Sequence, residues 1–126
     1  AEKTAFTEVL FDAAPSVKVQ IGNDTFYLLS IDGVKRADLF TQCEAVFKEQ
    51  CACYFAEKFT ETMAKIGHPV GETVALRLYN FQNHQVTEIP NRPVSEENQM
   101  ELRVARELRN GLAKVERLEL WMLRVI

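Results

Sequence analysis

The chain has 126 residues, of which 47% are hydrophobic and 26% are charged, so it is a single globular domain and not a disordered, collagen-like or low-complexity chain. Its formal net charge of -3 gives no long-range attraction to nucleic acid or to an anionic membrane, and therefore disfavours both as partners. No apolar run approaches the length of about 20 residues that crosses a bilayer, so we expect no membrane span.

The N-terminal segment allows two interpretations. Phe6, Val9 and Leu10 follow the spacing of an amphipathic helix over residues 4–13. A strand over residues 6–11 is the competing interpretation. We favour the helix.

A β-hairpin is predicted next. Val17, Val19 and Ile21 alternate with polar residues, and Gly22-Asn23-Asp24 supplies a turn before the apolar run 26–31. Alternation, turn residues and a second apolar run are typical of two antiparallel strands.

Residues 34–66 form the longest helical pattern, which Gly67-His68-Pro69 ends. Within it, apolar side chains recur at every fourth position, and such a row advances about 40° per step around a helix of 3.6 residues per turn. The row consists of Cys43, Phe47, Cys51, Phe55, Phe59 and Met63. One unbroken helix would also span about 50 Å, too long for a compact domain of this size. We therefore expect either a break near residues 50–54 or an outer part that projects and packs on another chain.

The next segment predicts a second hairpin. Apolar and polar residues alternate over 74–79, a polar turn follows at 82–85, and a short strand over 86–89 ends at Pro90.

A shorter helix and a final strand complete the prediction. Ser95 is a suitable N-cap, and the helix is expected to end at Asn110-Gly111. Its expected core face consists of Met100, Val104, Leu108 and Ala105. Residues 115–126 are rich in Val, Ile and Leu, and we predict a buried strand there.

These elements predict a single α+β domain over residues 1–126. Its sheet is mainly antiparallel, made of two hairpins plus the C-terminal strand. One long helix, continuous or broken, and one shorter helix pack on it.

The three cysteines lie between positions 43 and 53. On one continuous helix, Cys43 and Cys51 stand two turns apart, and Cys51 and Cys53 point about 200° apart, so we expect neither a disulfide nor a metal site. Cys43 and Cys51 are interpreted as core residues and Cys53 as the accessible thiol. Without disulfides, the cytoplasm is the expected location.

No catalytic, metal-binding or phosphate-binding motif occurs, so we expect no catalytic residue, metal or cofactor. Arg103, Arg106 and Arg109 form a basic strip that would suit nucleic acid, but Glu101 and Glu107 interrupt it. A charged helix face in water is the simpler interpretation.

The long helix carries more large rings than one small sheet covers, and excess apolar surface indicates a partner or a pocket. The leading hypothesis is a non-catalytic interaction module that homodimerises, or binds another protein, through the outer part of helix 34–66. The alternative is a binding protein or enzyme with a pocket for a small apolar ligand between the sheet and that helix. The residues expected at these surfaces are Phe47, Cys51, Tyr54, Phe55, Phe59, Tyr79 and Trp121.

Overall fold

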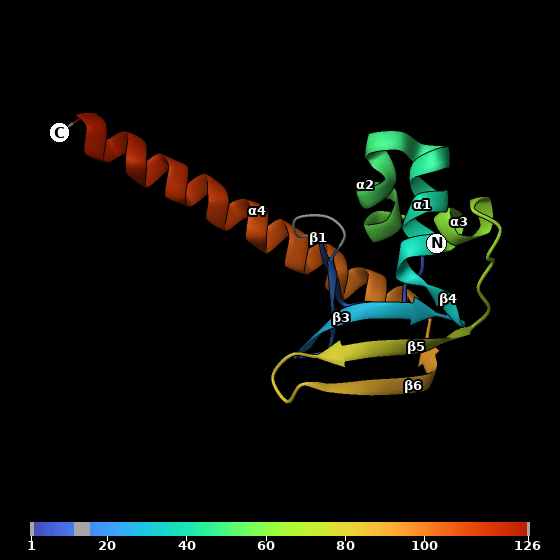
Figure 1. Ribbon diagram of the computed structural model, residues 1–126. Helices are drawn as coiled ribbons and strands as arrows, with labels where there is room; N and C mark the ends of the chain where they lie inside the picture. Colours follow the sequence, from blue (N-terminus) through green and yellow to red (C-terminus); the bar gives the residue numbers. More distant parts are fainter. Residues whose placement is uncertain (1, 12–15, 126) are drawn as a thin grey trace.

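The computed structural model describes residues 2–11 and 16–125 and has an α+β architecture (Figure 1). Six strands form one antiparallel sheet in the order β1-β2-β3-β5-β6, and β4 pairs with β3. The strands are β1 (Glu8–Phe11), β2 (Val17–Ile21), β3 (Asp24–Ile31), β4 (Val34–Lys35), β5 (Thr73–Asn80) and β6 (Gln85–Pro93). The helical elements are α1 (Arg36–Phe47), the 3-10 turn η1 (Lys48–Gln50), α2 (Cys51–Glu57), α3 (Phe59–Lys65) and α4 (Glu96–Val125). The predicted fold class and antiparallel sheet are confirmed.

Both predicted hairpins are present. Strands β2 and β3 pair from Ile21 and Asp24 outward, and Gly22 between them has a φ of 63°, which glycine adopts without a steric cost. Strand β6 continues to Pro93 instead of ending at Pro90. Strand β6 lies at the edge of the sheet, and its register with β5 shifts beside Pro90. A proline is tolerated there because the N–H group that it lacks is not needed to pair two central strands.

The helix predicted over residues 4–13 is wrong, and the competing strand is closer to the structure. β1 pairs with β2 in a register that sets Val9 opposite Val19, and both are buried. Pairing satisfies the backbone of this segment, whereas a helix of about ten residues is marginal in water. Ala13, the predicted helix end, lies outside the described residues.

The predicted 34–66 helix is broken twice. The 3-10 turn η1 separates α1 from α2, and Lys58, with φ -134° and ψ 55°, separates α2 from α3. The first break, at η1, reaches residue 50, the start of the segment 50–54 near which a break is predicted. Each break turns the next stretch of the winding apolar row back toward the sheet, so every member of the row except Phe47 is at most 5% exposed. The predicted stop is confirmed, because α3 ends at Lys65 and Gly67 has a φ of 90°.

The break at η1 also makes the prediction of unpaired Cys43 and Cys51 wrong. Because α2 folds back on α1, the two Cα atoms lie 5.6 Å apart and the side chains form a disulfide. Cys53 is an exposed free thiol, as predicted. The disulfide removes the reason for expecting a reducing compartment.

The C-terminal third differs most from its prediction. Helix α4 runs through Asn110 and Gly111 to Val125, so the predicted helix end and the predicted strand over 115–126 are both wrong; Ile126 lies outside the described residues. Gly111 costs a helix about 1 kcal/mol, but apolar residues keep a helical spacing on both sides of it. None of the described helices has both the length and the apolar composition that a membrane crossing requires.

We expect the Cys43–Cys51 disulfide to contribute about 2–3 kcal/mol to the free energy of unfolding, because it closes a short loop in the unfolded chain. The variant Cys43→Ala/Cys51→Ala should therefore unfold at a lower urea concentration than the oxidised protein, as followed by circular dichroism. Reduction of the wild type should have a similar effect. Cys53→Ser is the control and should leave the midpoint unchanged; equal midpoints for all variants would contradict the role of the disulfide.

Candidate functional site

The first turns of α4 are fixed to the rest of the molecule, which we call the body (residues 2–11 and 16–95), by side chains of Asn98 and Gln99. Asn98 Nδ2 donates to the carbonyl oxygens of Thr4, at 3.0 Å, and Pro93, at 2.9 Å. Gln99 Nε2 donates to the Glu57 carbonyl at 3.1 Å. Both side chains are buried, so these bonds satisfy amide N–H groups that water cannot reach; the Gln99 Oε1 atom is buried without a hydrogen-bond partner.

Farther along, two ion pairs hold α4 against the body. Arg106 Nε lies 3.5 Å from Glu57 Oε1, and Arg109 Nη1 lies 3.0 Å from Glu8 Oε2. Leu102, on the same side of the helix, is fully buried. Two of the three arginines in the predicted basic strip are thus bound to carboxylates of their own chain, which does not favour nucleic acid as their partner.

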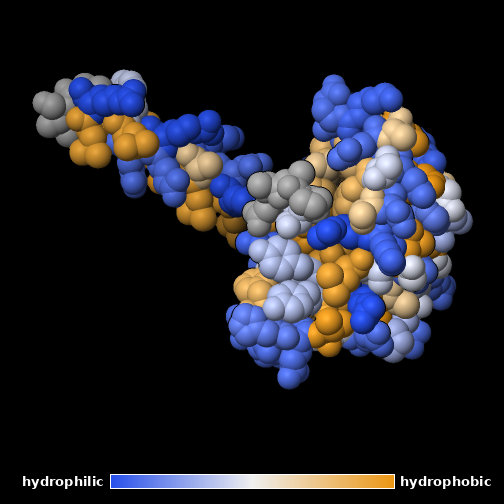
Figure 2. Space-filling model, in the orientation of Figure 1, coloured by the Kyte–Doolittle hydropathy of each residue, from blue (hydrophilic) through white to orange (hydrophobic). Residues whose placement is uncertain are grey.

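Beyond these contacts α4 projects from the body (Figure 1). Six of the large exposed apolar side chains on α4 follow helical spacing and form a continuous row, which we call the α4 stripe. Figure 2 shows hydrophobic side chains gathered along one side of the projecting helix and hydrophilic ones along the other. The stripe consists of Val104, Leu108, Leu112, Val115, Leu118 and Met122, each between 51% and 65% exposed.

The stripe faces away from the body. At 100° per residue, the side of α4 that carries Leu102, Arg106 and Arg109 lies roughly 160° around the axis from the stripe. The predicted core face of this helix is therefore wrong, since Met100 is 66% exposed and Val104 and Leu108 belong to the stripe. The contact that α4 makes with the body leaves the stripe open along its whole length.

The seven residues predicted at the functional surface are not brought together. Phe55, Phe59 and Cys51 are buried in the core. The rings of Phe47 and Tyr54 stack at the helical surface, with centroids 4.6 Å apart. The other two are Tyr79, on β5, and Trp121, which is 61% exposed near the outer end of α4.

The stripe is not evident from the sequence because a helix end is predicted at Gly111. That prediction places Val104 and Leu108 on a core face and the residues after Gly111 in a strand. The detectable signal was the spacing of three or four residues that continues across Gly111 from Leu108 to Val115.

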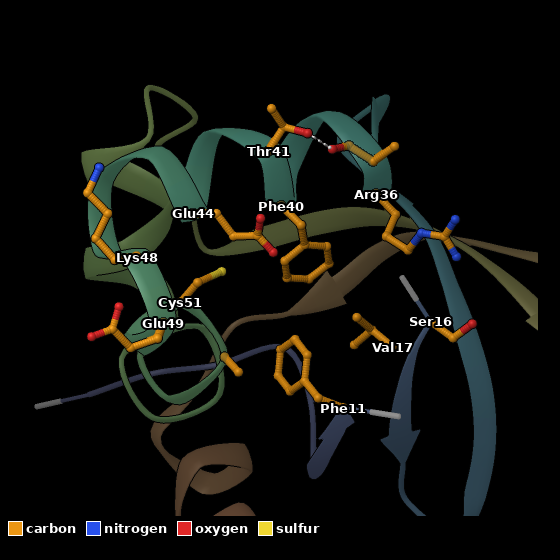
Figure 3. A pocket seen from close by; sticks show the side chains of 12 residues that line it. Phe11, Ser16, Val17, Arg36, Phe40, Thr41, Glu44, Lys48, Glu49 and Cys51 are labelled. Carbon is orange, nitrogen blue, oxygen red and sulfur yellow. Dashed lines mark hydrogen bonds between the residues drawn. The ribbon is translucent and has the colours of Figure 1, made fainter. Parts of the chain in front are cut away.

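A cleft of about 830 Å³ lies between the sheet edge and the helices (Figure 3). Phe11 of β1 and Phe40 of α1 point toward one another there, with ring centroids 5.6 Å apart, beside Val17. Charged side chains, among them Glu44 and Lys48, lie around this apolar floor. Of the residues predicted to line a pocket, only Cys51 lines this one.

The surroundings of the exposed Cys53 thiol disfavour its reaction as a nucleophile. Cys53 Sγ donates a hydrogen bond to Glu57 Oε2 at 3.0 Å. This bond, together with burial and the negative charge of Glu57, raises the pKa of the Cys53 thiol above its ordinary value. The reactive thiolate is therefore scarce at neutral pH.

The two histidines are each hydrogen-bonded to a neighbouring side chain. His68 Nε2 lies 2.7 Å from Gln42 Oε1, and His84 Nδ1 lies 3.0 Å from the Tyr79 hydroxyl. In the part of the chain that the structure describes, no group of three or more His, Cys, Asp or Glu side chains could hold a metal ion.

Comparison with protein-family models, curated proteins and solved structures found no match for this chain. Its function is therefore inferred from its own residues.

The hydrogen bond to Glu57 predicts how Cys53 reacts. Glu57→Gln should lower the pKa of Cys53, because it removes both the carboxylate acceptor and its negative charge. Alkylation by iodoacetamide at mildly alkaline pH should then be several-fold faster than in the wild type. The control is Arg106→Gln, which removes the Arg106–Glu57 ion pair but keeps the carboxylate, and should not accelerate the reaction. Equal rates for Glu57→Gln and the wild type would rule out this control of the thiol.

Proposed function

We propose that this protein is a non-catalytic interaction module that homodimerises through the α4 stripe. The observation that carries the proposal is a row of six large apolar side chains, all more than half exposed, on a helix whose opposite side is already bound to the body. Monomeric proteins rarely expose contiguous apolar surface of this kind, and larger patches mark interaction sites.

The proposal keeps the expected type of function but moves the surface. The hypothesis from sequence placed the excess apolar surface on helix 34–66, whereas Phe55 and Phe59 of that segment are buried. The excess lies on α4 instead, which at about 1.5 Å per residue is about 45 Å long. An amphipathic helix with one free apolar side is the element that pairs with another helix.

Charged residues in the stripe should disrupt the dimer. Val115→Glu/Leu118→Glu places two carboxylates where apolar side chains would be buried, so the dissociation constant should rise at least about a hundredfold. Light scattering coupled to size-exclusion chromatography, up to high micromolar concentration, measures the change. All variants carry Cys53→Ser, which excludes dimers linked through this thiol.

A matched control adds the same charge to the other side of the helix. Asn110→Glu/Ala113→Glu introduces two carboxylates at exposed positions away from the stripe, and should leave the dimer intact. A wild-type protein that stays monomeric throughout the concentration range would refute homodimerisation. Equal weakening by both double variants would show that the stripe is not the interface.

The cleft supports a second candidate function, the binding of a small apolar or aromatic ligand. Its volume of about 830 Å³ lies within the range of small-molecule sites, and its floor is formed by Phe11, Val17 and Phe40. Phe40 and Phe11 meet edge to face, one of the arrangements that aromatic rings prefer.

Binding in the cleft should raise the melting temperature, because a ligand that binds only the folded protein stabilises it. A thermal-shift screen of apolar and aromatic metabolites tests this, with Ala52→Trp, which fills the cleft, as the variant that should lose the shift. The double variant Val115→Glu/Leu118→Glu should keep it. The absence of any stabilising compound in a broad library, or a shift that survives Ala52→Trp, would contradict a binding function for the cleft.

A further inference from the structure

We infer that the two copies of α4 pair in parallel and in register, as a two-stranded coiled coil in which Lys114 of each copy binds Glu119 of the other. The inference rests on the proposed homodimer and names the orientation and contacts of its interface. Three features of α4 carry it: the spacing of its apolar residues, the charges beside them, and the direction in which the body lies.

The first feature is the spacing. From Val104 onward, the residues on the exposed side are spaced alternately four and three apart, which is the repeat of positions d and a in a coiled coil. These residues are Val104, Leu108, Gly111, Val115, Leu118 and Met122. No charged residue interrupts this seam. Val115 at an a position followed by Leu118 at a d position is a combination that favours two parallel strands.

The second feature is the pair of charges that flanks the seam. In this repeat Lys114 occupies position g and Glu119 the following position e, and both are exposed. In a parallel coiled coil, a residue at g lies beside position e of the next repeat in the partner, five residues farther along. Lys114 of each copy therefore meets Glu119 of the other, which gives two interhelical ion pairs related by the two-fold axis.

An antiparallel dimer would lose this complementarity. The antiparallel register that covers the most apolar layers sets Leu108 of one copy beside Leu118 of the other. In that register, a residue at position g of one copy faces a residue at position g of the other, and their two residue numbers add up to about 228. Lys114 would therefore lie against Lys114 of the second copy. Two like charges would then meet at the centre of the interface, whereas the parallel arrangement pairs opposite charges.

The third feature is the position of the body. Because Leu102, Arg106 and Arg109 hold the body on the side of α4 opposite the stripe, a parallel pair carries its two bodies on opposite outer sides of the coiled coil. The body has 11 acidic and 9 basic residues. The two negatively charged bodies are thus kept apart although both lie at the same end of the helix pair.

Spin labels on the outer side of α4 test the orientation. Asn110, Arg117 and Arg124 are exposed, seven residues apart, and face away from the seam. Each is replaced in turn by cysteine in the Cys53→Ser protein, and a nitroxide is attached; Cys43 and Cys51 are held in their disulfide. Pulsed electron-electron double resonance then measures the distance between the two copies of each label.

Parallel pairing predicts three closely similar distances. Antiparallel pairing about residue 113 predicts similar separations along the axis, about 10 Å, for the labels at 110 and 117, but about 33 Å for the label at 124. Similar distances support the inference, and a much longer distance at 124 overturns it while leaving the proposed homodimer intact. A monomeric wild type would overturn the homodimer and this inference together.

A charge exchange tests the named contact. Lys114→Glu should weaken the dimer roughly tenfold, because it sets a carboxylate at position 114 against Glu119 of the other copy at two places. The exchange Lys114→Glu/Glu119→Lys restores opposite charges in the parallel register and should return the dissociation constant close to that of the wild type. In the antiparallel register the exchange would still leave two like charges facing each other. A dimer that is unaffected by Lys114→Glu, or that the exchange does not rescue, contradicts the pairing of Lys114 with Glu119. Arg117→Glu, the same charge change on the outer side, is the control.

Discussion

The contact between the base of α4 and the body decides which side of this helix is free. Asn98 and Gln99 are buried there and donate to backbone carbonyls of residues far away in sequence. Burying these amides without partners would cost several kcal/mol, so the hydrogen bonds determine how the helix is rotated about its axis. The ion pairs of Arg106 and Arg109 hold the next two turns in the same orientation. The apolar side of α4 is left facing solvent because the more polar side makes the contact with the body.

The breaks in the 34–66 segment have the opposite effect on their apolar residues. A straight helix would have carried the winding row around to solvent, but η1 and Lys58 turn each piece back toward the sheet. Phe6, Phe55 and Phe59 meet there with ring centroids 5.4 to 6.1 Å apart. The same fold brings Cys43 to Cys51 and opens the cleft beside Phe40. The body thus buries Phe55 and Phe59, two of the rings predicted to face a partner, while α4 carries most of the large exposed apolar side chains.

The sequence predicted only part of the candidate site, as α4 and residues 34–66 show. Exposed apolar surface is present, but little of it lies on residues 34–66, where the periodicity predicts it, since Phe55 and Phe59 are buried. Its predicted location was wrong, because burial depends on how each helix is rotated against its neighbours. Of the seven residues predicted at the functional surface, only Trp121 lies on α4. Because a strand was predicted around Trp121, this residue did not reveal the stripe. A cleft does lie between the sheet and the helices, but of the residues predicted to line a pocket there only Cys51 lines it.

The sequence by itself determined the α+β class, both hairpins, the helix stop at Gly67 and the requirement that residues 34–66 break or project. These are local properties: alternation, turn residues, capping and the pitch of a helix act over fewer than ten residues. Only the tertiary structure decided that residues 8–11 form a strand, that Cys43 and Cys51 meet, and that α4 continues through Gly111 with its apolar side outward. The strand depends on β2 and the orientation of α4 on the carbonyls of Thr4 and Glu57, which are distant in sequence. The disulfide depends on the turn at η1, which lies between the two cysteines and folds α2 back on α1. Local preferences at these positions were weak enough for such distant contacts to outweigh them.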